Sequence, residues 1–211
     1  MAKAPPVDKR RQILDAAIHV FARQGFHASR VSDIADEAGV AYGLVYHYFE
    51  SKDEVLNELF TERWSLLLGA IEEVDGQPIG AREKLDTVAR FIVDSYRHEP
   101  DLMKVIIVEV TRAANSFGRT HLPEIRRAYD MIAKIVADAQ QAGTFRKDVD
   151  PEFASMWFYG AIEQLLSGWV FELIPGGEAD FDRAREMVVE TICGGLDAPA
   201  TPRTRTASGS S

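Results

Sequence analysis

The chain has 211 residues, of which 46% are hydrophobic and 27% are charged, and these values are typical of a soluble globular protein. Its single cysteine, Cys193, excludes an intrachain disulfide framework, and the N-terminal "MAKAPPVDKRRQ" lacks the apolar stretch of a signal peptide. No run approaches the roughly eighteen apolar residues of a membrane span, so the sequence predicts a cytoplasmic protein without a membrane partner.

The net charge of −9 is unevenly distributed along the chain. Residues 1–30 carry six Lys and Arg against two Asp and Glu, whereas residues 53–211 carry seventeen against twenty-seven. An acidic protein with one locally basic end is suited to contact a polyanion through that end alone. The overall negative charge therefore does not exclude a nucleic-acid partner.

Apolar residues recur at three- and four-residue spacings, and sustained apolar/polar alternation is absent, so we predict an all-α protein of about nine helices. Gly25 and Gly39 are placed to end the first two helices. Ser51, with Glu54 three residues later, is a capping box that begins the fourth. The expected helices cover residues 8–24, 31–38, 41–47, 51–74, 81–98, 100–115, 122–142, 151–173 and 179–195.

Residues 31–47 contain two short helices that are joined by "AGVA". A tight turn with a glycine between two helices is the geometry that lets the second helix enter a major groove. Ile34, Ala35 and Val45 supply the apolar contacts between the two helices. A plain helical hairpin inside a bundle has the same spacing, so this spacing alone leaves both interpretations open.

The wider segment from Gln12 to Phe60 resembles the N-terminal DNA-binding region of TetR-family transcriptional regulators. The matching features are "ILDAA…F…GF", "V.DIA.EAGV", "YHYF" and "SKDEVL", in the order and at the spacing of the family. The resemblance implies a helix-turn-helix DNA-binding domain at 1–52 and a ligand-binding and dimerisation domain at 53–196, linked by the helix from 51. The tail at 197–211 is rich in Pro, Ser and Thr and is expected to be disordered.

The resemblance also implies which side chains meet DNA. Gly43 allows close approach of the backbone, and Tyr46 and His47 offer polar tips for phosphates or base edges. Lys52 matches the family's phosphate-contacting lysine at a helix N-terminus, and residues 9–11 are expected to form a flexible basic arm. The predicted DNA-binding residues are Ser29, Arg30, Ala41, Tyr42, Gly43, Tyr46, His47 and Lys52.

The sequence departs from the family pattern at two of these helices. Leu44 is apolar where the family often has a polar residue, so base reading there is apolar at best. Arg30 stands where a small hydroxyl residue is common, and Ser29 or Ser32 is therefore expected to cap the second helix.

The predicted helix at 151–173 is apolar nearly all round, so it must be covered on several sides. With the helix that follows, it resembles the family's dimerisation pair, and a two-fold dimer places two recognition helices on a palindromic operator. An entirely intramolecular core helix is the alternative. The predicted dimer-interface residues are Trp169, Phe181, Ala184, Val188 and Thr191.

Aromatic and aliphatic side chains of residues 81–173 are sufficient as a set to line an apolar pocket, although each alone is equally explained as ordinary core. A basic cluster lies between two of these helices, at Arg112, Arg119, His121, Arg126 and Arg127. An apolar cavity with a basic mouth suits a long apolar tail with an anionic head. The predicted ligand-binding residues are Tyr96, Met103, Ile106, Arg112, Phe117, Arg119, Tyr129, Trp157 and Gln164.

The stretches "GFHASRVSDIADEAGVA" and "GAIEQLLSGWV" look most similar to the acyl-CoA-responsive, FadR-type regulators of fatty-acid degradation. That resemblance implies a homodimeric repressor without a cofactor, which a hydrophobic effector such as a long-chain acyl-CoA releases from its operator. A drug-like or aromatic effector is one alternative, and a helical carrier or enzyme with a vestigial helix-turn-helix is another. HExxH, CxxC, P-loop and GxSxG motifs are absent, so we predict neither an enzyme nor a metal site.

Overall fold

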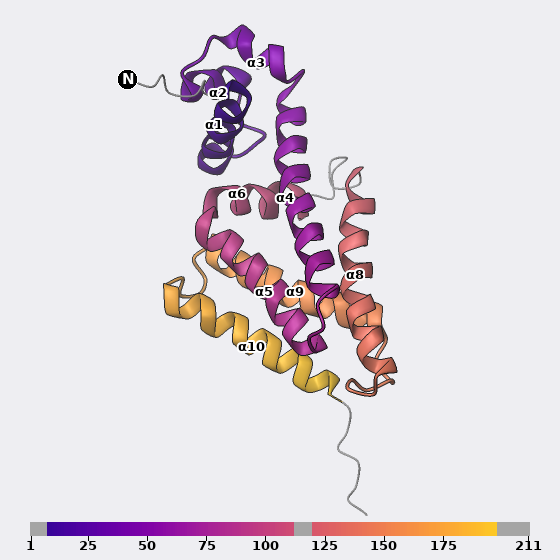
Figure 1. Cartoon of the computed structure of the whole chain (residues 1–211). Coiled ribbons are helices and arrows are strands. Elements are labelled where there is room, and N and C mark those ends of the chain that lie inside the picture. Colours follow the sequence, from indigo (N-terminus) through magenta and orange to yellow (C-terminus); the bar gives the residue numbers. More distant parts are fainter. Residues whose placement is uncertain (1–7, 112–119, 198–211) are drawn as a thin grey trace, which may run out of the picture.

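The computed structural model describes residues 8–111 and 120–197 (Figure 1). Within these ranges β-structure is limited to an isolated bridge between Phe145 and Asp197, and the prediction of an all-α fold is confirmed. The nine α-helices and one π-helical segment of the described ranges are α1 (Lys9–Gln24), α2 (Val31–Ala38), α3 (Tyr42–Tyr48), α4 (Lys52–Asp75), α5 (Ala81–His98), α6 (Pro100–Val105), η1 (Ile106–Thr111), α8 (Leu122–Gln141), α9 (Pro151–Val170) and α10 (Glu178–Leu196).

The helices form a small unit and a larger one that share a continuous apolar core. In Figure 1, α1 to α3 lie together at one end, and α4 runs from them into the larger unit. There α8 packs along α9, and α10 packs against α5 and α9. None of the described helices is long and apolar enough to cross a membrane. Except for Asp197, the tail that was predicted to be disordered lies outside the described residues.

The ends of the first helices follow local chemistry that the sequence predicts. Gly25, with a φ of 80°, ends α1, and Gly39, with a φ of 61° in the left-handed region, ends α2. The Ser51 hydroxyl accepts a hydrogen bond from the Glu54 N–H at 3.1 Å and begins α4. Two glycines and one serine therefore set these helix ends.

The start of α2 differs from the prediction that Ser29 or Ser32 caps it. The first N–H groups of the helix are approached by Asp33, whose carboxylate accepts from the Arg30 N–H at 2.8 Å. The Ser29 hydroxyl instead donates to the Phe26 carbonyl at 2.7 Å. The serine cap is wrong because the hydroxyl turns back into the preceding loop.

Two predicted helices also differ from the structure at their ends. The α-helix predicted at 100–115 becomes π-helical from Ile106, and a wider turn of this kind leaves no clear mark in the apolar periodicity. α9 ends at Val170, because Glu172 adopts a φ of 53° and the Leu173 N–H donates to the Gly168 carbonyl at 2.7 Å. The apolar sequence simply continues into the loop.

Candidate DNA-binding and effector-binding sites

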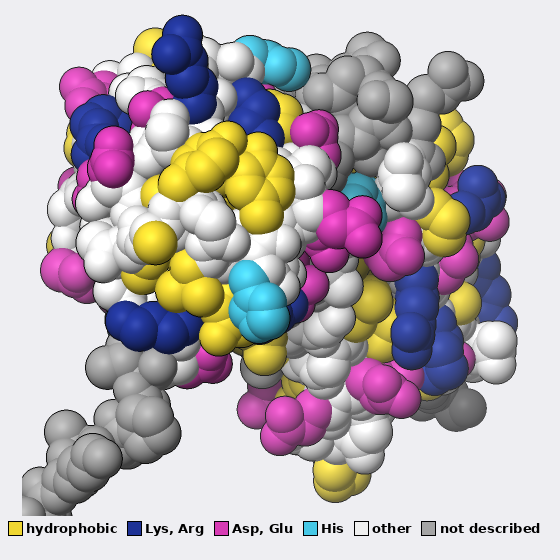
Figure 2. Space-filling model, turned by 90° about the horizontal axis from the view of Figure 1, so that it is seen from above, with side chains coloured by type: hydrophobic (Ala, Val, Ile, Leu, Met, Phe, Trp, Pro, Cys, Tyr) yellow, Lys and Arg dark blue, Asp and Glu magenta, His cyan; other side chains and the backbone are white. Residues whose placement is uncertain are grey.

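The short helix α3 separates an inward face from an outward one. Val45 is 1% exposed and packs into the core, whereas Tyr42 and Tyr46 are 53% and 46% exposed. The two tyrosine rings lie 5.2 Å apart, and the Tyr42 hydroxyl donates to the Tyr46 hydroxyl at 3.2 Å. Figure 2 looks down on this end of the molecule, where hydrophobic and histidine side chains reach the surface beside lysines and arginines. The aromatic excess of α3 thus forms a second, outward surface.

Three other predicted DNA-binding residues are exposed at the same end, namely Arg30, Ala41 and His47. At Gly43 an added Cβ would meet nothing within 4 Å, so the backbone there is open to close approach by a large partner. Ser29 is different, because it is buried and its hydroxyl is bound to the Phe26 carbonyl. The Ser29 side chain is therefore not presented to DNA in this conformation.

Lys52 holds the loop between α1 and α2. Its ammonium donates to the carbonyls of Phe26 at 2.5 Å and Ser29 at 2.8 Å, and it lies 4.4 Å from the centre of the Phe26 ring. A phosphate contact by Lys52 would require the ammonium to leave these partners. The structure thus gives this lysine a positioning role that the sequence did not predict.

The predicted flexible basic arm is instead the first turn of α1. The Arg10 guanidinium pairs with the Glu58 carboxylate at 2.7 Å, while Arg11 pairs with Asp15 at 2.7 Å and with Glu62 at 3.0 Å. The arm was wrong because carboxylates on α1 and α4 lie within reach of both arginines. These side chains fasten α1 to α4.

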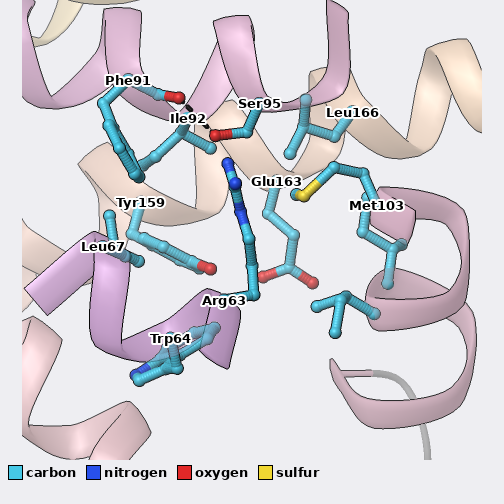
Figure 3. Close-up of a pocket in the computed structure, with 12 residues that line it drawn as sticks. Arg63, Trp64, Leu67, Phe91, Ile92, Ser95, Met103, Tyr159, Glu163 and Leu166 are labelled. Atoms are coloured by element: carbon cyan, nitrogen blue, oxygen red, sulfur yellow. Dashed lines mark hydrogen bonds between the residues drawn. The ribbon is translucent and has the colours of Figure 1, made fainter. Parts of the chain in front are cut away.

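A cavity of about 30 Å³ lies among α4, α5, η1 and α9 (Figure 3). Met103 and Ile106, which the sequence predicted as ligand-binding residues, are part of its wall. Other apolar walls come from Trp64, Phe91 and Leu166. Four polar residues, Arg63, Ser95, Tyr159 and Glu163, also line the cavity. Apolar walls with a few convergent polar groups are typical of a binding site for a small molecule, although such sites normally have a larger volume.

The polar residues of this cavity were not predicted as ligand contacts. The Arg63 side chain is 12% exposed, and burial lowers the pKa of its guanidinium, which lies 3.4 Å from the Glu99 carboxylate. Burial and the nearby Glu163 carboxylate raise the pKa of the Tyr159 hydroxyl. Glu163, a polar interruption in an apolar helix, is the signal in the sequence that could have pointed here.

Most of the other predicted ligand residues lie elsewhere. Tyr96 packs against the rings of Trp169 and Phe181, at 5.5 and 5.9 Å, and does not line the cavity. Trp157 and Gln164 are exposed on the outer face of α9, so their assignment to the cavity is wrong. The remaining three, Arg112, Phe117 and Arg119, fall outside the described residues.

A separate groove of about 300 Å³ runs between α8 and α9, and Arg126 and Tyr129 line it. The Tyr129 ring lies 5.3 Å from the ring of Tyr159, so this pair of tyrosines stands between the groove and the cavity. His121, also from the basic cluster, is buried at 4.1 Å from the Phe60 ring, and burial lowers the pKa of its imidazole. The basic cluster is thus divided between a surface groove and the core.

The predicted dimer residues divide between two faces of the late helices. Trp169, Phe181 and Val188 are buried within the protomer, so they belong to its own core and do not form an outer surface. Ala184 is half-buried, and Thr191 is exposed. The exposed apolar side chains of the outer face are Phe153, Met156 and Trp157 on α9 and Met187 on α10.

A hydrogen bond joins the two units close to the cavity. The Glu109 carboxylate of η1 accepts from the Phe26 N–H at 3.2 Å, and its side chain is only 12% exposed. Ile106 and Ile107 of the same π-helical segment line the cavity. The loop between α1 and α2 is consequently held by Lys52 on one side and Glu109 on the other.

Reactive and metal-binding chemistry has little support in the described residues. Burial raises the pKa of the Cys193 thiol to about 11, and a thiol in that state is a poor nucleophile near neutral pH. Among residues 8–111 and 120–197, no group of three or more His, Cys, Asp and Glu side chains is arranged to hold a metal ion.

Comparison with known proteins agrees with this arrangement. Residues 13–59 match the bacterial regulatory proteins of the tetR family, and residues 82–192 match the tetracyclin repressor-like C-terminal domain. The chain belongs to the TetR family. It is thus a DNA-binding transcriptional regulator of the repressor type, and the family resemblance of residues 12–60 is confirmed.

Similar TetR-family proteins include regulators of fatty acid metabolism. The fatty acid metabolism regulator protein of Bacillus subtilis is 32% identical over 163 residues, which cover 77% of this chain and 84% of that protein. The transcriptional repressor KstR2 of Rhodococcus jostii is 26% identical over 205 residues, covering 92% and 98%. The crystal structure of FadR from Bacillus subtilis in complex with stearoyl-CoA superposes with a TM-score of 0.78 at 27% identity, covering 88% of this chain and 98% of that one.

Proposed function

We propose that the protein is a homodimeric repressor that binds a palindromic operator and is released from it by a long-chain acyl-CoA. It acts on DNA in the cytoplasm and catalyses no reaction of its own. The observation that carries this proposal is the cavity among α4, α5, η1 and α9, in a chain that is similar over most of its length to a regulator crystallised with stearoyl-CoA.

The outer face of α9 and α10 supports the dimer. Phe153 and Trp157 are exposed one turn apart on α9, with their rings 6.3 Å from each other, and Met187 is exposed on α10. Large apolar side chains gathered on one surface mark a site of protein association. A two-fold pairing of this face would place two copies of α3 on the half-sites of a palindrome.

The size of the cavity supports a mechanism of release. Pockets for small molecules have volumes of about 300–1,000 Å³, far larger than the 30 Å³ of this cavity. A long acyl chain must therefore move its walls apart. Two of those walls, α4 and η1, carry Lys52 and Glu109, which hold the loop between α1 and α2.

This arrangement couples the ligand to the DNA-binding helices. A ligand that prefers displaced walls also prefers a displaced loop, and with it a changed separation of the two recognition helices in the dimer. Because both ligands act on the same conformational equilibrium, acyl-CoA must lower the affinity for the operator, and the operator must lower the affinity for acyl-CoA equally.

The groove between α8 and α9 suits the head of the effector. Arg126 lines this groove together with two carboxylates, Asp130 and Glu152, and Arg127 is exposed on the same helix. Guanidinium groups bind phosphates well, and the nucleotide head of CoA carries several. We therefore place the head at the groove and the acyl chain beyond the pair of Tyr129 and Tyr159.

A gel-shift experiment with DNA fragments from the promoters near the gene tests this proposal. Stearoyl-CoA is expected to release a saturated protein–DNA complex, whereas CoA without an acyl chain is expected to leave it intact. If stearoyl-CoA does not release the complex, the proposed effector is wrong, whereas the proposal that the protein is a repressor still holds. A repressor should bind at least one fragment with an affinity that falls steeply as the salt concentration rises. Absence of such binding would contradict the proposal that the protein is a repressor.

A further inference from the structure

We propose that the cavity recognises a neutral carbonyl oxygen of its ligand, which the Tyr159 hydroxyl and the Arg63 guanidinium bind together. This inference rests on the proposed function and names the chemistry that the same cavity selects. It concerns the interior of the cavity, where a plain hydrocarbon chain would offer these two groups no hydrogen bond.

Tyr159 is the first observation. Its side chain is nine-tenths buried, and its ring lies 6.1 Å from that of Trp64 and 5.3 Å from that of Tyr129. Figure 3 shows the hydroxyl pointing into the space that Arg63 and Glu163 also enter. Among the described residues, none is hydrogen-bonded to this hydroxyl. A hydroxyl that lines a cavity without a protein partner is open to a hydrogen bond with a ligand oxygen.

Arg63 is the second observation. Its side chain extends from α4 across the cavity toward Ser95 of α5 in Figure 3. Arginine presents five N–H donors, and the ion pair of this guanidinium with Glu99 spans 3.4 Å. The Ser95 hydroxyl donates to the Phe91 carbonyl at 2.5 Å, so its proton is already committed. The donors that remain for a ligand in the cavity are therefore Arg63 and Tyr159.

The charges around the cavity favour a neutral oxygen over a carboxylate. Arg63 is accompanied by two carboxylates, Glu99 and Glu163. A ligand carboxylate would place its negative charge beside that of the Glu163 carboxylate in the cavity wall, which is unfavourable. The Glu163 carboxylate also disfavours ionisation of Tyr159, so its hydroxyl keeps the proton that it donates. A thioester or a ketone supplies an acceptor without adding charge.

Two ligands that differ only at the carbonyl test this assignment. Stearoyl-CoA has a thioester, and its thioether analogue S-octadecyl-CoA has the same head and chain without the carbonyl oxygen. Isothermal titration of the full-length protein should show the thioester bound about tenfold or more tightly. Tyr159→Phe should lose most of this preference, and Arg63→Gln should lower it too. Stearate, as a free carboxylate, should bind more weakly than stearoyl-CoA.

The matched control is Tyr96→Phe, because Tyr96 is also a partly buried tyrosine but packs against Trp169 and Phe181 away from the cavity. It should keep the full preference for the thioester. A 3-ketosteroid compared with its 3-deoxo analogue distinguishes a ketone from a thioester as the source of the oxygen.

The possible outcomes separate this inference from the proposed function. Equal affinity of wild-type protein for thioester and thioether, with no preference for the ketone either, would overturn the carbonyl site while leaving acyl-CoA as effector. A preference that Tyr159→Phe leaves unchanged, with an unchanged melting temperature, would overturn it as well. If none of the ligands binds, the proposed effector class itself is wrong.

Discussion

The two ends of α4 belong to regions that present their functional side chains in opposite ways. At the DNA-binding end, Tyr42, Tyr46 and His47 project into solvent from a helix of seven residues. At the effector end, Arg63 and Tyr159 are buried around a cavity of about 30 Å³. The first region is thus exposed to a large rigid surface, whereas the second must open if it is to admit the proposed ligand. Under the proposed function, opening the second region is a means of moving the first.

The largest effect on operator binding is expected from a substitution in the proposed dimer interface, because both regions depend on a second subunit. Trp157→Glu places a charge in the exposed apolar face of α9, and loss of a central interface tryptophan costs about 2–4 kcal/mol of association free energy. Analytical ultracentrifugation should show dissociation at concentrations where the wild type is dimeric, and operator affinity should fall with it. Leu66→Glu, at an equally exposed leucine of α4, is the control and should leave the dimer intact. If the Trp157 variant remains dimeric, the dimer interface does not include this face of α9.

The DNA-binding region is tested alone by Tyr46→Ala. The side chain is half exposed, so its removal should weaken operator binding by about 1–3 kcal/mol with little change in stability. Fluorescence anisotropy with operator DNA measures the loss, and titration with stearoyl-CoA should give the wild-type affinity. Unaltered operator affinity would show that this outward surface of α3 does not face the DNA.

Two cations of the same end are expected to behave differently. Arg30 is exposed. In a plot of the logarithm of the operator-binding constant against the logarithm of the salt concentration, Arg30→Met should reduce the slope by about 0.9 for each phosphate that the Arg30 guanidinium neutralises in the wild type. Lys52→Met should instead leave the salt slope nearly unchanged and lower the melting temperature, because Lys52 binds the carbonyls of Phe26 and Ser29. A flattened slope in the Lys52 variant would mean that its ammonium leaves the loop for a phosphate.

The smallest effect concerns the hydrogen bond that joins the two regions. Glu109→Gln replaces the charge-assisted hydrogen bond to the Phe26 N–H, worth about 1.5–3 kcal/mol, by a neutral one worth about 1 kcal/mol. The factor by which stearoyl-CoA lowers operator affinity should shrink severalfold, with both separate affinities nearly retained. Glu72→Gln, at an exposed position of α4, is the control. If stearoyl-CoA lowers operator affinity by the same factor in Glu109→Gln as in the wild type, the coupling between the two regions runs through α4 alone.

The DNA-binding region could largely be predicted from the sequence because its motifs resemble those of the TetR family, which residues 13–59 match. Helical periodicity alone does not predict which side chains face outward, since Tyr42 lies three residues before the buried Val45, on nearly the same side of the helix, and is nevertheless exposed. The packing roles of Lys52 and Arg11 could not be predicted, because their partners, Phe26 and Glu62, are brought to them by tertiary packing. The division of the chain at residue 52 stays a prediction, since α4 continues through it without a break.

The effector region was harder to predict because α9 is apolar nearly all round. Its sequence therefore does not indicate which side of the helix faces the core. Trp157 was assigned to the cavity and lies on the outer face, whereas Trp169 was assigned to the outer face and lies in the core. Arg63 was overlooked because an arginine on a long helix normally faces solvent. Met103 and Ile106, which were predicted as ligand contacts, do line the cavity, and Glu163, an acidic residue in an apolar helix, is a further signal that could have marked it.

The coupling between the two regions is tested most directly by measuring it in both directions. Operator affinity is determined with and without saturating stearoyl-CoA, and stearoyl-CoA affinity with and without saturating operator. Both affinities should fall by the same factor, because one conformational equilibrium links the sites. Stearoyl-CoA that binds tightly and leaves operator affinity unchanged would contradict the account.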